Sequence, residues 1–172
     1  MQSQILEGGF SNARAVMTAM ARPGEIMQIV GAQPPAPLSP AAGAVLLTLC
    51  DPETPLFLAK GYDTQPVRDW ITFHTGAPFV QAAAAMFAVG EWDQLPLVEF
   101  SRGTPEYPDR SATLIVERET LTNSGAVLEG PGIKDRALLS LPETHAFREN
   151  ASLFPLGLDF VFTCGDRLAA LP

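Results

Sequence analysis

The residues of this 172-residue chain that could take part in chemistry are scattered along it, and most follow a predicted helix. Arg22 precedes a Pro-Gly pair, Asp51 and Thr54 flank Pro52, and His74 precedes a Thr-Gly pair. A cation favours the C-terminal end of a helix, and Asp and Thr commonly form turns, so a structural role explains each of them. For His74, a partly buried imidazole bonded to the backbone and a ligand or interface role both remain open.

A shared site becomes the competing interpretation if the fold brings these helix ends together. Loops at one edge of an open α/β sheet converge, and ligands usually bind at such an edge. We predict that some of four residues, joined by Arg102, form a mixed-charge patch on one side of the molecule. The four are Arg22, Asp51, Thr54 and His74.

Common catalytic and cofactor-binding motifs are missing from the sequence. Its two His and two Cys have no zinc-type spacing, and no nucleophile elbow, Walker loop or dinucleotide fingerprint occurs. Neither lysine, Lys60 or Lys134, lies in a motif that supports a Schiff base with pyridoxal phosphate. We therefore expect no metal and no pyridoxal phosphate, and we expect Cys50 and Cys164 to be buried, reduced thiols.

The composition points to a subunit of a larger assembly. The net charge is −8 and the pI about 4.6, which disfavours binding to nucleic acid or to an anionic membrane. Charged residues make up 17% of the chain, against a usual ~25%. A surface poor in charge suits contact with other chains. No signal peptide or spanning segment is recognised, so a cytoplasmic location is expected.

The hydropathy pattern predicts one domain over residues 1–172, with helices alternating with short apolar strands. The capping pair Ser39-Pro40 should begin a buried helix. The predicted helices are 11–21, 41–50, 66–75, 79–85, 95–101 and 142–152. The predicted strands are 25–30, 56–59, 86–89, 111–116, 126–128, 136–140 and 159–163. This order predicts an α/β or α+β sandwich around a mixed sheet.

Six segments in the same order resemble the signatures of one bacterial family. They are MTAMARPG (17–24), TLCDPETP (48–55), FHTGA (73–77), GTPEYP (103–108), LEGPGI (128–133) and FPLGLD (154–159). Each is a weak motif, but together they cover nearly the whole chain. The sequence thus resembles the PhnH family, a subunit of the carbon–phosphorus (C–P) lyase system that bacteria use to break down phosphonates.

The resemblance implies a fold, a set of partners and a role. It implies a single-domain three-layer α/β sandwich with a mixed sheet, similar to the large domain of pyridoxal-phosphate-dependent transferases but without their cofactor site. It implies a homodimer that joins PhnG, PhnI and PhnJ in the C–P lyase core complex. With PhnG, PhnI and PhnL, such a subunit supports transfer of the ribose triphosphate of ATP to an alkylphosphonate, with release of adenine.

The catalytic role of the chain itself stays open at this point. The family resemblance favours a subunit that is not catalytic on its own, with the chemistry in PhnI and PhnJ. The alternative is a free-standing enzyme, or a module that binds a nucleotide or phosphonate, using Arg22, His74 and Arg102.

Overall fold

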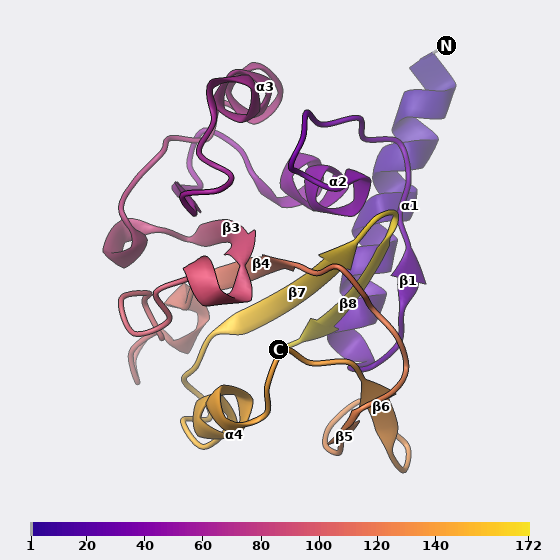
Figure 1. Cartoon of the computed structure of the whole chain (residues 1–172), viewed down its shortest axis with the longest axis vertical. Helices are drawn as coiled ribbons and strands as arrows, with labels where there is room; N and C mark the ends of the chain where they lie inside the picture. The colour runs from indigo at the N-terminus through magenta and orange to yellow at the C-terminus, as the bar shows by residue number, and fades with distance from the viewer. Residues whose placement is uncertain (1) are drawn as a thin grey trace.

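A six-stranded mixed sheet forms the centre of the computed structural model, which describes residues 2–172, with side chains from Ser11 onward (Figure 1). Its strand order is β1-β8-β7-β4-β3-β2. Strands β2, β3, β4 and β7 run parallel, whereas β8 is antiparallel to both β7 and β1. The strands are β1 (Met27–Gln28), β2 (Leu56–Leu58), β3 (Phe87–Glu91), β4 (Thr113–Glu117), β7 (Asp159–Cys164) and β8 (Arg167–Leu171).

The central strands are buried on both faces because their side chains are apolar on both faces. In β4, Leu114, Ile115 and Val116 are fully buried, and β7 has a similar run from Phe160 to Thr163. Continuous apolar runs of this kind are typical of parallel strands that are covered on both sides. They explain why both strands could be predicted from sequence.

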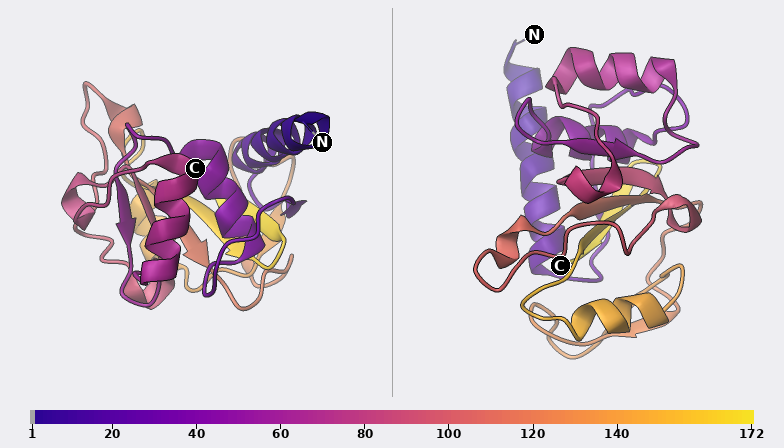
Figure 2. Two further views of the ribbon diagram at one scale, coloured as in Figure 1. Left: turned by 90° about the horizontal axis from the view of Figure 1, so that it is seen from above. Right: turned by 90° about the vertical axis from the view of Figure 1, so that its left-hand side faces the viewer.

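Helices lie on both sides of the sheet, as the right-hand view of Figure 2 shows. Helices α2 (Pro40–Leu49) and α3 (Gln65–Thr75) lie on one side and contact each other. Helix α4 (His145–Ala151) lies on the other, where Phe147 packs on Phe160 and Phe162 of β7. Helix α1 (Gln2–Ala21) packs against β8, β1 and α2. The predicted mixed α/β fold is confirmed.

The ends of α2 and α3 follow the capping chemistry in the sequence. The Ser39 side chain accepts a hydrogen bond from the backbone N–H of Ala42, and Pro40 is the first helical residue. Helix α3 ends at Gly76, which has a φ of 70° that a residue with a side chain rarely adopts. Both helix ends therefore lie where the sequence predicts them.

A short two-stranded sheet, β5 (Ala126–Leu128) with β6 (Ala137–Leu139), stands apart from the main sheet. The Gly-Pro-Gly segment 130–132 lies between these two strands, in the turn expected of it. The end of α1 contacts this hairpin closely, because a Cβ on Gly132 would clash with the Ala21 carbonyl. The hairpin is thereby packed against α1.

Several predicted elements are wrong in type or extent. The predicted helix 79–85 is only a 3₁₀ turn, η1 (Ala82–Ala84), and 95–101 is not helical. The predicted strand 25–30 is reduced to β1, and β8 was not predicted. The other two 3₁₀ turns are η2 (Trp92–Gln94) and η3 (Pro108–Arg110).

Helix α1 also differs from its prediction. It begins at Gln2 rather than Ser11. Its buried face contains Ala15, Val16 and Ala19, and Met17 is 70% exposed. Cys50 is buried as predicted, but Cys164 is only half-buried; both are free thiols. Over residues 2–172, no helix is long and apolar enough to cross a membrane.

Candidate functional site

Asp51 and Thr54 form a single turn after α2. The Asp51 backbone N–H donates to Thr54 Oγ1 at 2.7 Å, and that hydroxyl donates to the Asp51 carbonyl at 2.9 Å. Pro52 of this turn lies against Gly76, the residue that ends α3. The structure therefore brings the turn next to the end of the helix that carries His74.

His74 is exposed and packs on its aromatic neighbours. Its ring centroid lies 4.9 Å from that of Trp70 and 5.0 Å from that of Phe73. Within the part of the chain whose side chains are described, the imidazole makes no hydrogen bond. The buried, backbone-bonded imidazole considered from the sequence is therefore not what the structure contains.

Arg102 and Arg22 lie apart from that turn. Arg102 bridges to Ser111 just before β4 begins, whereas the Asp51–Thr54 turn precedes β2, two strands away. Arg22 is exposed at the end of α1, 3.6 Å from Glu25. Asp51, Thr54 and Arg102 thus lie near the amino ends of the parallel strands, and their predicted role in binding stays a prediction.

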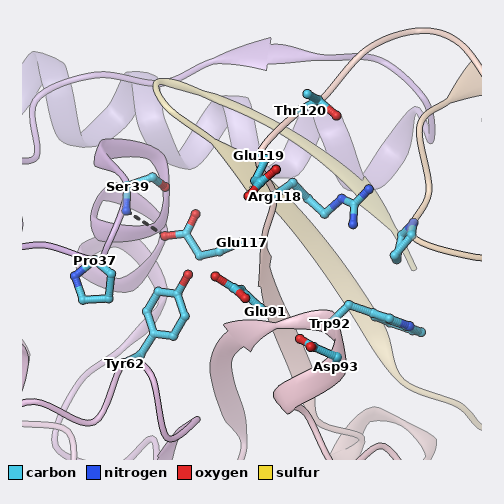
Figure 3. Close-up of a pocket in the computed structure, with 11 residues that line it drawn as sticks. Pro37, Ser39, Tyr62, Glu91, Trp92, Asp93, Glu117, Arg118, Glu119 and Thr120 are labelled. Carbon is cyan, nitrogen blue, oxygen red and sulfur yellow. Dashed lines mark hydrogen bonds between the residues drawn. The ribbon is translucent and has the colours of Figure 1, made fainter.

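The main cavity lies at the opposite, carboxyl ends of these strands (Figure 3). Its volume is about 490 Å³. In open α/β sheets, ligands bind in the crevice outside the carboxyl ends of the strands. The lining residues are Pro37, Ser39, Tyr62, Glu91, Trp92, Asp93, Glu117, Arg118, Glu119, Thr120 and Pro142.

Glu117 lies at the base of this cavity and is itself 7% exposed. Its Oε1 accepts from the Ser39 backbone N–H at 2.7 Å, and its Oε2 accepts from Thr163 Oγ1 at 2.9 Å. Burial raises the pKa of Glu117, and the bonds from Ser39 and Thr163 oppose that rise. The carboxyl group thus ties the start of α2 to the ends of β4 and β7.

Glu91 and Tyr62 stand beside Glu117. Glu91 is paired with Glu117 in the register of β3 and β4, so both side chains leave the same face of the sheet at adjacent strand ends. Burial, followed by the charges of Glu117 and Glu91, raises the pKa of the Tyr62 hydroxyl. The hydroxyl is therefore protonated at neutral pH. It points towards the two carboxyl groups (Figure 3).

The charge of the lining is predominantly negative. Arg118 is its single cationic side chain, against four carboxyl groups, those of Glu91, Asp93, Glu117 and Glu119. Among the side chains described, from Ser11 onward, none of these five groups forms an ion pair within 4 Å. Such a lining repels polyanions and offers hydrogen-bond acceptors to a donor-rich or cationic group.

We also examined the described residues for metal-binding groups, reactive thiols and a second cavity. In the described residues, no group of three or more His, Cys, Asp and Glu side chains could hold a metal ion. Burial raises the pKa of the Cys50 thiol to about 12, so it is protonated and a poor nucleophile at neutral pH. A second hollow of about 430 Å³ contains Lys60, but its Arg68 is paired with Asp63 at 3.0 Å.

The cavity residues were not singled out from the sequence, although a signal for them exists. Glu91 ends the buried run FAVGE and Glu117 ends the run TLIVE. A carboxylate at the end of each of two parallel strands places both at one edge of the sheet. Most of the residues predicted from the sequence to form a site lie instead at the ends of helices.

Substitutions of Glu117 test the role of its carboxyl group. Because burial raises its native pKa, the native state holds this proton more tightly than the unfolded chain does, and stability falls as pH rises through that pKa. Glu117→Gln can still accept from Ser39 and bond Thr163 but cannot ionise, so its stability relative to wild type should increase from pH 4 to pH 8. Glu117→Ala leaves two buried donors unpaired and should cost about 2–4 kcal/mol.

Urea denaturation at several pH values measures both effects. Glu119→Gln, at an exposed position of the same cavity, is the matched control and should follow wild type. Equal pH dependence for Glu117→Gln and wild type would contradict the role of Glu117 described here.

The chain matches known proteins over nearly its whole length. The family model described as "Bacterial phosphonate metabolism protein (PhnH)" matches residues 10–172. A curated relative from Rhizobium meliloti (strain 1021), the alpha-D-ribose 1-methylphosphonate 5-triphosphate synthase subunit PhnH, is 39% identical over 194 aligned positions, covering 99% of this chain and 94% of the relative. The six segments, the family match and this relative agree, and the chain therefore belongs to the PhnH family of bacterial phosphonate metabolism proteins.

Proposed function

We propose that this protein is an accessory subunit of the C–P lyase core complex, assembled with PhnG, PhnI and PhnJ and not catalytic alone. In this role it supports, with PhnG, PhnI and PhnL, transfer of the ribose triphosphate of ATP to an alkylphosphonate, with release of adenine. The observation that carries the proposal is the near full-length similarity to a curated subunit of a ribose 1-methylphosphonate 5-triphosphate synthase.

The electrostatics of the chain support an accessory role. The triphosphate of ATP carries several negative charges, and the main cavity is lined by four carboxyl groups and one guanidinium. A protein with a net charge of −8 also repels such a substrate at longer range. The ribose triphosphate should therefore be held by a partner subunit.

The alternative is an independent enzyme or binding module that uses Arg22, His74 and Arg102. These residues do not form one pocket in this chain. Arg22 is exposed beside Glu25 at the end of α1, while Arg102 lies by the start of β4. The alternative would need a second subunit to bring them together.

Exposed apolar side chains support association with other chains. Phe73 on α3, Val98 in the loop after η2 and Phe154 after α4 are each more than 80% exposed. Large exposed apolar side chains are often covered in an assembly. We include in the proposal a homodimer of the isolated chain and a cytoplasmic location.

The proposal also includes a fold relationship without the corresponding cofactor. A three-layer arrangement similar to the large domain of pyridoxal-phosphate-dependent transferases fits helices on both sides of a mostly parallel sheet. Lys60 and Lys134 are both exposed. A lysine that forms a Schiff base is typically activated by desolvation in an apolar pocket, and an exposed position does not provide that setting.

Purified protein tests the accessory role directly. Alone, it should show no turnover of ATP with methylphosphonate, and light scattering should report about twice the 18.4 kDa chain mass. Co-expressed with tagged PhnG, PhnI and PhnJ, it should elute with them in size-exclusion chromatography. Turnover without the other subunits would contradict the proposal, as would failure to co-elute.

His74→Ala separates an interface role from a structural one. The exposed imidazole makes no described hydrogen bond, so the melting temperature should change little, consistent with a surface substitution within about 0.5 kcal/mol. Co-elution with the other subunits should be impaired. His145→Ala, which removes the other, also exposed histidine, is the matched control and should assemble normally. Normal assembly of His74→Ala would show that His74 has no role at an interface.

Pyridoxal phosphate should not react with the protein. Added cofactor should give no Schiff-base absorbance beyond that of free lysine at equal concentration, because both amines are exposed and neither lies in a desolvated pocket that would activate it. A saturable band that disappears in Lys60→Ala or Lys134→Ala would overturn this part of the proposal.

A further inference from the structure

We propose that the cavity at the carboxyl ends of β3 and β4 binds a cationic head group, a guanidinium or an alkylammonium, between Glu91, Glu117 and Tyr62 (Figure 3). This inference concerns the chain by itself and does not depend on the accessory role proposed above.

Glu91 and Glu117 place two carboxyl groups next to each other at one edge of the cavity. Glu91 and Glu117 are the last residues of neighbouring parallel strands and are paired in register, so their backbones are about 4.8 Å apart. Like charges at such positions destabilise a sheet. Their interaction is visible in Glu117, where the charge of Glu91 adds to burial in raising the pKa. A cation placed between them would remove this repulsion.

The Tyr62 hydroxyl also faces this cavity. The residue is 5% exposed, yet its hydroxyl has no hydrogen-bond partner among the side chains and backbone groups described. It points into the cavity towards the carboxyl pair (Figure 3). The ring is buried, whereas the hydroxyl oxygen opens onto the cavity, where a ligand could bond to it. Its oxygen can accept a bond from an N–H donor held by the carboxyl groups.

Among the side chains described, from Ser11 onward, none forms an ion pair with the carboxyl group of Glu91 or Glu117. Arg118 lines the cavity, but its guanidinium is turned away from Glu91 and Glu117 (Figure 3). Its Nε is buried without a partner, and the side chain forms no ion pair within the described residues. Both carboxyl groups therefore line the cavity without a cation beside them, although Glu117 keeps its hydrogen bonds from Ser39 and Thr163.

A guanidinium or ammonium group satisfies all three groups at once. It brings a positive charge and several N–H donors, and it presents no oxygen lone pair to the carboxyl groups. Charge-assisted bonds of this kind are about twice as strong as neutral ones. The head group could belong to a free small amine or to a basic side chain of a partner protein, and the two sources share this chemistry.

Trp92 provides a direct reporter of binding. It lines the cavity, and its indole Nε1 donates to Glu143 at 2.9 Å. Trp70, the only other tryptophan, is on α3 and does not line the cavity. An ¹⁵N-labelled sample thus gives one indole signal from the cavity and one internal control, assigned with Trp70→Phe.

The experiment is a titration of the full chain with n-butylguanidinium, compared with neutral n-butylurea. The Trp92 indole signal should shift saturably with the guanidinium only, while the Trp70 signal stays in place. Both Glu91→Gln, at an exposed position, and Tyr62→Phe should weaken the apparent affinity for n-butylguanidinium. For Glu91→Gln we expect a loss of about tenfold, because one charged hydrogen bond is lost. Glu106→Gln removes the same charge outside the cavity and should bind as wild type does.

The two sources are distinguished by co-expression of the Glu91→Gln/Tyr62→Phe double variant with PhnG, PhnI and PhnJ. Loss of co-elution identifies a partner's basic side chain as the occupant, and normal co-elution identifies a free amine. The inference is overturned by a Trp92 signal that does not saturate or that moves equally with n-butylurea. It is also overturned if the signal responds in the two cavity variants as it does in wild type.

Discussion

One buried carboxyl group connects the main parts of this fold. Glu117 is at the end of β4, and its two oxygens accept hydrogen bonds from Thr163 on β7 and from the backbone of Ser39 at the start of α2. The helix layer is thereby fixed to the carboxyl ends of the central strands by polar contacts as well as by apolar packing. Burying a carboxyl group is unfavourable unless it is hydrogen-bonded, and each of its oxygens has a partner here. The position of α2 and the shape of the cavity floor both depend on this arrangement.

The two ends of the parallel strands have different chemical character. At the carboxyl ends, carboxyl groups and a buried tyrosine surround a cavity. At the amino ends lie the Asp51–Thr54 turn and Arg102, with the end of α3 and exposed Phe73 beside that turn. Apart from Arg102, which immediately precedes one of them, these residues fall within the segments that resemble the PhnH family signatures. A subunit with these properties can use one end of its sheet for a small group and the other for contacts between proteins.

Local sequence signals predicted the elements whose cause is local. Ser39-Pro40 and Gly76 mark helix ends through capping, and the apolar runs of β4 and β7 mark buried strands. Strand β8 was missed because RLAAL has little β-branched character; it is a strand because β7 and β1 pair with it. The cavity was missed for a related reason. Glu91, Glu117 and Tyr62 are far apart in sequence, and only the register of β3 and β4 and the return of the chain after β2 bring them together.

The main sheet has two outer strands, β2 and β1, and their backbone hydrogen bonding limits how another chain can bind to the sheet. At one side, the N–H and C=O of Leu56 in β2 are bonded to Pro78 and Val80, a segment that follows α3. At the other side, β1 is only two residues long. A free, extended edge is what allows a foreign strand to add to a sheet and what allows aggregation. With one edge partly covered and the other minimal, stable association has to use side-chain surfaces, so a partner must match the shape of helices and loops instead of extending the sheet.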